Sequence, residues 1–394
     1  MRLKVVPEDF IVEEVLRPLE GKGEGKSGGP CVLYRVQKRA TTTLEVQARM
    51  ARALRLPRSA VSFPALKDRD AVAVQYATVR AGALRAPARI EGPGFVAERI
   101  GSLPHPLSPA DLAGNRFAIT VRDLSREEAE ALGQRLERAA AEGIPNYFDE
   151  QRFGSRTAAG DFPGRRILLR DAEGALRAHL AEPQAGDPPQ VRVFKQEVAQ
   201  HWGDWHYLLN IAPRPSNFRS VLTFLCDHPT DFRRALNLVT PRLLSLYLAA
   251  YQSRLWNRIA ARYLTVLLGN PEESLEIAGE PLPLFSGMAS RLPAGLAVLL
   301  PHHQARYEEP LLAKIVADVL AAEGLTVSDL KPRLLERAYL SRGERALGLF
   351  PKDSEASEPL PDERFPGRWS VRLRFTLPPG SYGTLVIKAL KRIA

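Results

Sequence analysis

An aspartate flanked by two cations, in the segment Lys67-Asp68-Arg69, has the residue types of a covalent catalyst. The segment lies between a short strand expected at Ser62-Phe63 and a longer strand expected over 71–79, so it should form a strand-to-strand turn. Neighbouring positive charge lowers the pKa of an aspartate, and a positioned, ionised carboxylate can act as a nucleophile. From spacing alone, a solvated charged turn is the more common explanation of these residues.

Two other segments superficially suggest chemistry. Residues 21–27 (Gly-Lys-Gly-Glu-Gly-Lys-Ser) depart from the P-loop pattern, because Glu20 occupies the position of the first glycine and Gly28-Gly29-Pro30 prevents a following helix. We expect a loop there. His201 and His206 are five residues apart with no third ligand type nearby, so aromatic packing is expected in place of a metal site.

The elements expected around this turn are a mixture of strands and helices. Alternating apolar residues predict strands at 10–15, 31–37, 71–79, 116–122 and 369–377. Capping residues or a first-turn proline predict helices from Thr42 to Leu54, from Ser125 to Gly143 and from Thr240 to Leu267. Composition predicts a loop or junction at 180–192, a small β-rich piece at 271–310 and a surface loop at 353–368. On the last strand, Arg372 and Arg374 face away from the core, either toward RNA or toward solvent.

The charge balance is compatible with a polyanionic partner. The chain has 394 residues, with 55 lysines and arginines against 45 acidic residues. Such an excess favours nucleic acid, although a solvated cationic surface explains it equally well. Two distant cysteines, Cys31 and Cys226, predict no disulfide framework and favour a reducing, cytoplasmic setting. No apolar run approaches the length needed to span a membrane, and the N-terminus does not read as a signal peptide.

The segment from Ala65 to Gln75 resembles the catalytic signature of the TruD family, Gly-x-Lys-Asp-Arg/Lys-x-Ala-x-Thr-x-Gln, with Ala65 replacing the glycine and Ala73 the threonine. Further segments resemble motifs of that family in the same order: Lys4 with Pro7-Glu8-Asp9-Phe10-Ile11-Val12-Glu13-Glu14, Gly114-Asn115-Arg116-Phe117, Asn146-Tyr147-Phe148-Asp149-Glu150-Gln151-Arg152-Phe153-Gly154, Tyr251-Gln252-Ser253-Arg254-Leu255-Trp256-Asn257 and Phe375-Thr376-Leu377-Pro378-Pro379-Gly380-Ser381-Tyr382-Gly383-Thr384. One such match would carry little weight, whereas the ordered set extends along nearly the whole chain.

The resemblance implies a tRNA pseudouridine synthase that isomerises a uridine, at position 13 of tRNA, with Asp68 as the nucleophile. The target base must be flipped out of the RNA, and an aromatic ring can then stack on it. Phe148 is the candidate for that stacking, and Asn146 and Lys4 are candidates for orienting the site. The remaining substrate-binding candidates are Lys67, Arg69, Phe10 and Gln151. Without the resemblance, Phe148 would be interpreted as a core residue, Asn146 as a turn residue beside Pro145 and Lys4 as a surface lysine.

The resemblance also implies the architecture. We expect an α+β fold in which residues 1–156 and 336–394 form a pseudouridine-synthase-type catalytic domain with a mixed, mostly antiparallel sheet. Residues 157–335 are expected to form an inserted α/β TRUD domain. The reaction needs no cofactor or metal, because it involves neither a redox change nor water activation. We expect a cytoplasmic monomer that acts on tRNA and has no membrane association.

Two alternatives belong to other functional classes. An RNA-binding or RNA-folding protein on the same scaffold would show the same charge and fold without catalysis. The presence of Lys67-Asp68-Arg69 and Asn146-Tyr147-Phe148 favours the enzyme over that alternative. An RNA methyltransferase should carry a glycine-rich cofactor turn after its first strand, and the sequence lacks one.

Overall fold

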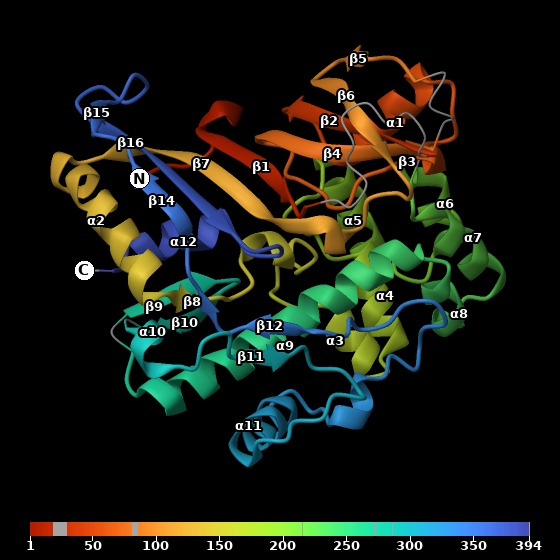
Figure 1. Cartoon of the computed structure of the whole chain (residues 1–394). Helices are drawn as coiled ribbons and strands as arrows, with labels where there is room; N and C mark the ends of the chain where they lie inside the picture. Colours follow the sequence, from red (N-terminus) through yellow and green to blue (C-terminus); the bar gives the residue numbers. More distant parts are fainter. Residues whose placement is uncertain (19–29, 81–85, 215, 272, 286, 394) are drawn as a thin grey trace. The chain divides into compact units, whose positions relative to one another are not determined.

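The computed structural model describes residues 1–18, 30–80, 86–214, 216–271, 273–285 and 287–393 (Figure 1). The loop expected at 21–27 lies outside these residues. The chain forms two compact units: unit 1 comprises Met1–Gly143 and Leu349–Ala394, and unit 2 comprises Ile144–Gly348. The division expected from the sequence, at 156/157 and 335/336, remains a prediction about where the inserted domain of the family begins and ends.

Unit 1 is built on one sheet. Its described strands are β1 (Phe10–Leu16), β2 (Cys31–Arg39), β3 (Val61–Ser62), β4 (Val72–Arg80), β5 (Arg89–Gly92), β6 (Phe95–Leu103), β7 (Leu112–Leu124), β14 (Lys352–Ala356), β15 (Leu360–Pro361) and β16 (Trp369–Leu377). Its described helices are α1 (Thr43–Ala53), α2 (Arg126–Glu142) and α12 (Gly383–Leu390). The strand order is β14-β16-β7-β1-β4-β2-β6-β5, with β15 paired to β16 and β3 to β4. Among these pairings only β1–β4 is parallel, which confirms the expected α+β class with a mixed, mostly antiparallel sheet.

Local sequence signals account for most of these elements. Thr42 and Glu45 form the expected capping box of α1, and Ser125 and Glu128 form that of α2. Strand β16 buries alternate residues, as its sequence predicts. Gly114 is needed where β7 approaches β16, because a Cβ at that position would lie 2.5 Å from the carbonyl oxygen of Leu377.

The expectation of a surface loop at 353–368 is wrong in part. Residues of this stretch form β14 and β15, which pair with β16 at the edge of the sheet. Their side chains are mostly exposed, because an edge strand has a neighbour on one side only. The polar composition therefore reflects an edge position in a sheet, a property that composition alone does not distinguish from a loop.

The starts of two strands and the end of a third lie together at one end of the sheet of unit 1. Ile11 of β1 lies opposite Val72 of β4 in the parallel pair, so the residues that precede both strands lie at the same end. Strand β2 is antiparallel to β4, with Lys38 opposite Ala73, so its last residues arrive at this end too. This topology brings together the segment before β1, the turn before β4 and the end of β2, which are far apart in sequence.

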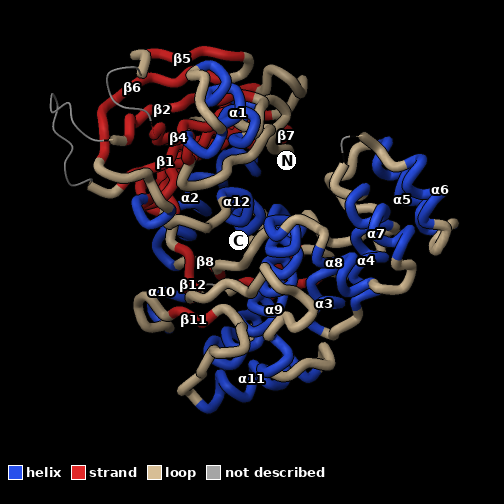
Figure 2. The backbone as a smooth tube through the Cα atoms, turned by 90° about the vertical axis from the view of Figure 1, so that its right-hand side faces the viewer, coloured by secondary structure: helices blue, strands red, loops and turns tan. Residues whose placement is uncertain are grey.

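Unit 2 is mainly helical. Its described helices are α3 (Pro163–Leu168), α4 (Ala172–Leu180), α5 (Pro189–Gln200), α6 (Trp205–Ile211), α7 (Arg219–Asp227), α8 (Phe232–Asn237), α9 (Pro241–Leu268), α10 (Met288–Arg291) and α11 (Pro310–Ala321). Its short strands are β9 (Glu273–Ile277), β10 (Glu280–Leu284), β11 (Ala297–Leu299) and β12 (Glu344–Ala346). Two further strands, β8 (Ile144–Pro145) and β13 (Gly348–Leu349), lie where the chain passes from one unit to the other. Figure 2 shows α4 to α8 grouped together to one side of α9.

Two expectations for unit 2 can be compared with these elements. The long helix from Pro241 is confirmed as α9, and most of its inward residues are fully buried. The stretch 180–192 is a loop only as far as Pro188, since α5 begins at Pro189 with proline in its first turn, where a missing N–H costs no hydrogen bond.

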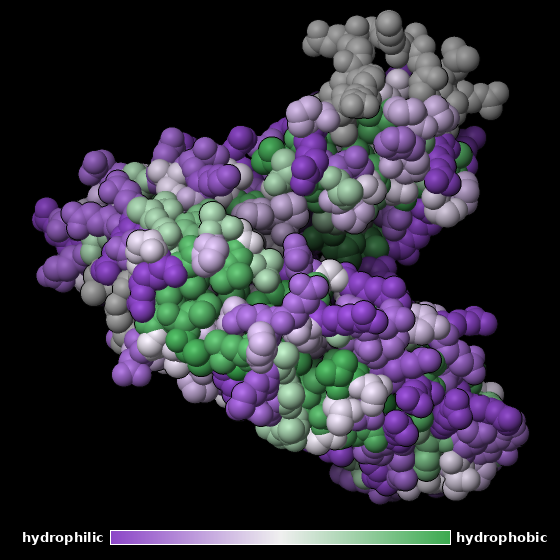
Figure 3. Space-filling view, turned by 60° about the horizontal axis from the view of Figure 1, so that its bottom comes forward, coloured by the Kyte–Doolittle hydropathy of each residue, from purple (hydrophilic) through white to green (hydrophobic). Residues whose placement is uncertain are grey.

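The molecular surface is largely hydrophilic on the face drawn in Figure 3, where purple residues surround smaller green, hydrophobic areas. In the described parts of the chain, no helix combines the length and the apolar character needed to cross a bilayer.

Candidate active site

Asp68 lies in the turn between β3 and β4, at the end of the sheet where the starts of β1 and β4 and the end of β2 lie together. Its side chain is 35% exposed, and its Oδ2 accepts a hydrogen bond of 2.6 Å from Nζ of Lys4. The carboxylate is thus paired with a cation and still reachable from solvent. Lys4 precedes β1, so the parallel β1–β4 pairing is what brings it to Asp68.

The conformation of Lys4 is unusual. Its φ is 55°, a left-handed value that is uncommon for a non-glycine residue and often occurs at functional sites. Its Nζ lies 4.3 Å from the ring centroid of Phe10, which in turn packs edge-on against Phe117 at 5.9 Å. Phe10 therefore provides a fixed aromatic surface against which the Lys4 ammonium is positioned toward Asp68.

Lys67 holds the turn from the other side. Its Nζ donates to Oδ1 of Asn115 at 2.5 Å and lies 3.2 Å from Oε1 of Glu14, whose side chain is fully buried. Oε2 of Glu14 also accepts the backbone N–H of Tyr76 in β4. Lys67 is thus anchored to the sheet by a buried ion pair, whereas Arg69 is exposed.

Thr43 and Gln75 fix the backbone of the turn. The backbone N–H of Lys67 donates to Oγ1 of Thr43 at 3.0 Å, and that hydroxyl donates to Oε1 of Gln75 at 2.9 Å. Nε2 of Gln75 donates to the carbonyl of Ala65 at 2.9 Å. Gln75 of the catalytic signature therefore has a structural explanation, because one side chain links the start of the turn to α1.

Lys38 was not singled out from the sequence, yet it contacts Asp68 directly. Its side chain is 1% exposed, and its Nζ donates to the backbone carbonyl of Asp68 and, at 2.9 Å, to that of Thr41. Burial lowers the pKa of Lys38 from 10.5 to about 8, although the nearby Asp68 carboxylate acts in the opposite direction. A sequence signal exists: Lys38 follows Val32, Tyr34 and Val36 on the buried face of β2.

The two departures from the family signature are accommodated by the backbone. Ala65 is not among the non-glycine residues with positive φ, so the glycine of the pattern is not needed for its conformation. Ala73 is fully buried in β4, opposite Val12 of β1 and Lys38 of β2. In this chain the turn that holds Asp68 is fixed by Lys38, Thr43 and Gln75.

The other predicted residues, Asn146, Phe148 and Gln151, belong to unit 2. Asn146 donates to the carbonyl of Ala346, and its own Oδ1 and backbone carbonyl accept from Arg345. The Arg345 guanidinium also lies 4.2 Å from the ring centroid of Phe148. Arg345 was missed, because it is remote in sequence and no local pattern marks it.

Helix α9 supports the same segment. The side-chain amide of Asn257 donates to the carbonyl of Phe148 and accepts its N–H, at 2.9 and 2.8 Å. Ser253, one turn earlier, accepts from Arg152 at 2.9 Å. Phe148 is 7% exposed and packs edge-on against Trp256 at 5.6 Å. The motif pair Ser253 and Asn257 thus binds the backbone and side chains of the Phe148 segment, while Gln151 lies exposed.

The histidine segment of unit 2 packs aromatic residues, as expected. Trp202 lies 4.9 Å from Trp205 and 6.1 Å from Phe232, between ring centroids. Within the described residues, no group of three or more His, Cys, Asp or Glu side chains is placed to hold a metal ion.

Comparison with known proteins gives a family for the chain. A family model described as tRNA pseudouridine synthase D (TruD) matches residues 1–390. A Methanocaldococcus jannaschii protein named "Probable tRNA pseudouridine synthase D 2" is 29% identical over 402 residues, which cover 98% of this chain and 91% of that protein. The "tRNA pseudouridine synthase D" of Aquifex aeolicus is 26% identical over 401 residues, with 99% and 98% covered.

A solved structure shares the fold. A crystal structure of a Methanosarcina mazei protein described as "Putative tRNA pseudouridine synthase D (TruD)" aligns with a TM-score of 0.69 and 23% sequence identity, and the alignment covers 100% of this chain and 93% of that one. The match of the family model along almost the entire length shows that the chain belongs to the TruD family of tRNA pseudouridine synthases.

Proposed function

We propose that this protein isomerises a uridine of tRNA, at position 13, to pseudouridine, with Asp68 as the nucleophile. The observation that carries the proposal is the state of Asp68: a partly exposed carboxylate, 2.6 Å from the Lys4 ammonium, on a turn whose backbone is tied to surrounding strands. A nucleophile must be accessible and also held in one geometry, and Asp68 meets both requirements.

The turn is preorganised by independent contacts. Gln75 fixes the carbonyl of Ala65, Thr43 fixes the N–H of Lys67, and Lys38 fixes the carbonyl of Asp68 itself. Little backbone freedom is left around Asp68, so binding energy from the RNA need not be used to order the catalytic carboxylate. Lys38, Thr43 and Gln75 act in this proposal as positioning residues.

The chemistry explains why no cofactor is required. The bond between C1′ and N1 of the uridine breaks, the base turns, and a bond between C1′ and C5 forms, while C5 loses a proton and N1 gains one. The substrate and product have the same composition and oxidation level, so neither an oxidant nor a water molecule is consumed. A carboxylate can form a transient covalent bond and then leave, and the proton transfer from C5 to N1 needs only ordinary acid–base groups, so no cofactor enters the balance.

Recognition of the flipped base is assigned to Phe148, with Asn146 as its neighbour on the same segment. Because Phe148 is 7% exposed and Arg345 lies against its ring, stacking requires local opening of this cluster when RNA binds. We further propose that the protein acts as a monomer in the cytoplasm, where its tRNA substrate would be found.

The decisive experiment maps pseudouridine in an unmodified tRNA transcript after incubation with wild-type protein, Asp68→Asn and Asp68→Ala. We expect product at position 13 with the wild type and a loss of at least about 10³-fold in rate with either variant. The affinity for tRNA should be nearly unchanged. Full activity of Asp68→Asn would remove Asp68 from its role, and tRNA binding by a wild-type protein that forms no product would favour the RNA-binding alternative.

A further inference from the structure

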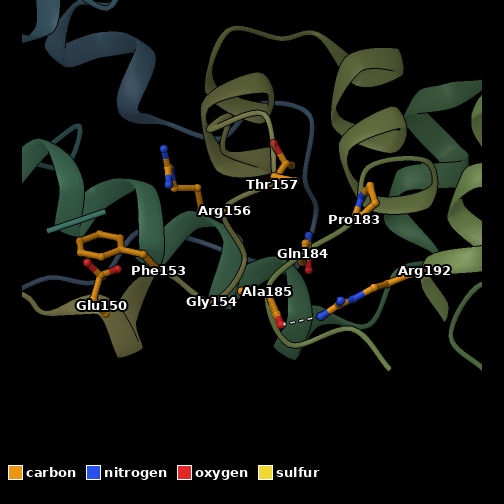
Figure 4. A pocket seen from close by; sticks show the side chains of 10 residues that line it. Glu150, Phe153, Gly154, Arg156, Thr157, Pro183, Gln184, Ala185 and Arg192 are labelled. Atoms are coloured by element: carbon orange, nitrogen blue, oxygen red, sulfur yellow. Dashed lines mark hydrogen bonds between the residues drawn. The ribbon is translucent and has the colours of Figure 1, made fainter. Parts of the chain in front are cut away.

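A pocket of ≈520 Å³ lies entirely within unit 2 (Figure 4). It is lined by the 3-10 helix Glu150–Phe153, the residues after it, the loop before α5 and Arg192 of α5. Two arginines, Arg156 and Arg192, line this pocket, and in Figure 4 they flank Gln184 and Ala185. The lining contains one acidic residue, Glu150, so the two arginines leave it with a net positive charge.

Arg156 is half-buried without a counterion. No carboxylate of the described residues lies within 4.0 Å of its guanidinium. Its Nη2 lies against two glycine turns, so that a Cβ at Gly160 or Gly279 would come within 3.0 or 2.9 Å of it. Both glycines have positive φ, which other residues adopt at a cost. An unpaired, partly desolvated cation is unfavourable, so the site favours an anion supplied from outside the chain.

Arg192 shows the same lack of a counterion on the opposite side of the lining. Its Nε and Nη2 donate to the backbone carbonyls of Asp187 and Ala185, at 3.0 and 3.4 Å. Carbonyls orient a guanidinium and leave its charge uncompensated. Glu150 does not neutralise either arginine by a direct ion pair, and its Oε1 accepts the N–H of Ala278 at 2.8 Å.

Other arginines of unit 2 differ from this pair. Arg165, Arg254 and Arg258 all reach Glu323, and the last two also reach Glu280. Their charges are balanced inside the protein. Arg156 and Arg192 differ from these three because no carboxylate of the described residues pairs with either guanidinium, so both remain available for an external ligand.

We propose that this pocket binds the phosphodiester backbone of the substrate RNA, with Arg156 and Arg192 each contacting a phosphate. The inference rests on the proposed function for the identity of the RNA. A guanidinium presents two parallel N–H donors that match two phosphate oxygens, and phosphate is the anion that a nucleic acid offers repeatedly. Such contacts position the RNA and carry no base specificity.

The test measures tRNA affinity at several salt concentrations for Arg156→Gln, Arg192→Gln and the double variant. Each single change should weaken binding several-fold and reduce the slope of log affinity against log salt by about 0.7 to 0.9. The single-turnover rate at saturating tRNA should stay at the wild-type level. Arg156→Lys should keep the wild-type slope while losing affinity, because it keeps the charge and loses the two-pronged contact.

Arg234→Gln is the matched control. It removes an exposed arginine from unit 2 that is already paired with Asp231 at 3.4 Å, so the slope should not change. Wild-type affinity and slope in the double variant would overturn the proposal. So would binding of adenosine monophosphate that depends on Arg156 while tRNA affinity does not. If the wild type makes no pseudouridine but its RNA binding still depends on both arginines, the proposed function fails and the pocket assignment stands.

Discussion

The two units hold their candidate functional segments with different cations. In unit 1, three lysines surround the turn of Asp68: Lys4 contacts the carboxylate, Lys38 the carbonyl and Lys67 the buried Glu14. In unit 2, Arg345 bridges the backbone and side chain of Asn146 and covers the ring of Phe148.

The difference follows from the shapes of the two cations. A lysine ammonium is a compact charge that can contact a single oxygen atom and can lose its proton when buried, whereas arginine is a planar fork that stays charged and stacks on rings. The Asp68 turn is therefore held by three separate point contacts, to the Asp68 carboxylate, to its backbone carbonyl and to the buried Glu14. The Phe148 segment is held by a flat group that organises two peptide units and an aromatic ring together.

Lys67→Met should have the largest effect on this arrangement. Its removal leaves the fully buried carboxylate of Glu14 without its cation. Breaking a buried ion pair in this way costs about 3–5 kcal/mol. We expect a large drop in the urea midpoint together with loss of activity. Because Glu14→Gln removes the stranded charge, the double variant Lys67→Met/Glu14→Gln should recover much of the stability, and its failure to do so would argue against the ion pair as the cause.

Lys4→Met should reduce catalysis more than stability. The side chain is partly exposed, so little folding energy depends on it, but Asp68 loses the contact that orients its carboxylate. A misplaced catalytic group can cost about 10²-fold in rate. Single-turnover rates at saturating tRNA should show this loss in kcat with a nearly unchanged KM, and Lys4→Arg should restore part of it. A change confined to KM would instead assign Lys4 to RNA binding.

Arg345→Lys tests whether the shape of the guanidinium, and not only its charge, holds the Phe148 segment of unit 2. An ammonium cannot bond both oxygens of Asn146 and cover Phe148 in one geometry, so hydrogen bonds are lost although the charge remains. We expect a loss of about 1–2 kcal/mol in the free energy of unfolding, measured by urea titration. Wild-type stability in this variant would show that charge alone holds the segment.

Lys38 should give the smallest effect, a pH dependence of stability. Its pKa is about 8 in the folded protein and near 10.5 in the unfolded chain, so between these values the unfolded state binds more protons. Stability from this group therefore rises with pH across that window, by about 1 kcal/mol per pH unit, and is lost as pH falls through about 8. Urea titrations at pH 8 and pH 9.5 should show the rise in wild type and its absence in Lys38→Met. Arg345 of unit 2 should contribute no such change, because a guanidinium stays protonated across this pH range.

Much of the fold could be predicted where the signals are local. The capping boxes at Thr42 and Ser125, the proline in the first turn of α9 and the alternation along β16 each depend on residues within a few positions of one another. The stretch 353–368 was predicted as a loop, because exposed edge strands and loops have similar composition. Asp68 itself was found through resemblance, since a charged turn has no distinctive periodicity.

The sequence by itself determined the family, the mixed sheet and the identity of the candidate nucleophile, since motifs and short-range patterns are written along the chain. Only the tertiary structure decided what surrounds Asp68. The parallel pairing of β1 with β4 places Lys4 at its carboxylate, and the end of β2 places Lys38 at its backbone carbonyl. Arg345 likewise donates a hydrogen bond to Asn146, although about half of the chain separates the two residues in sequence. Such contacts depend on which strands and helices become neighbours, and that choice is made by the packing of the whole unit.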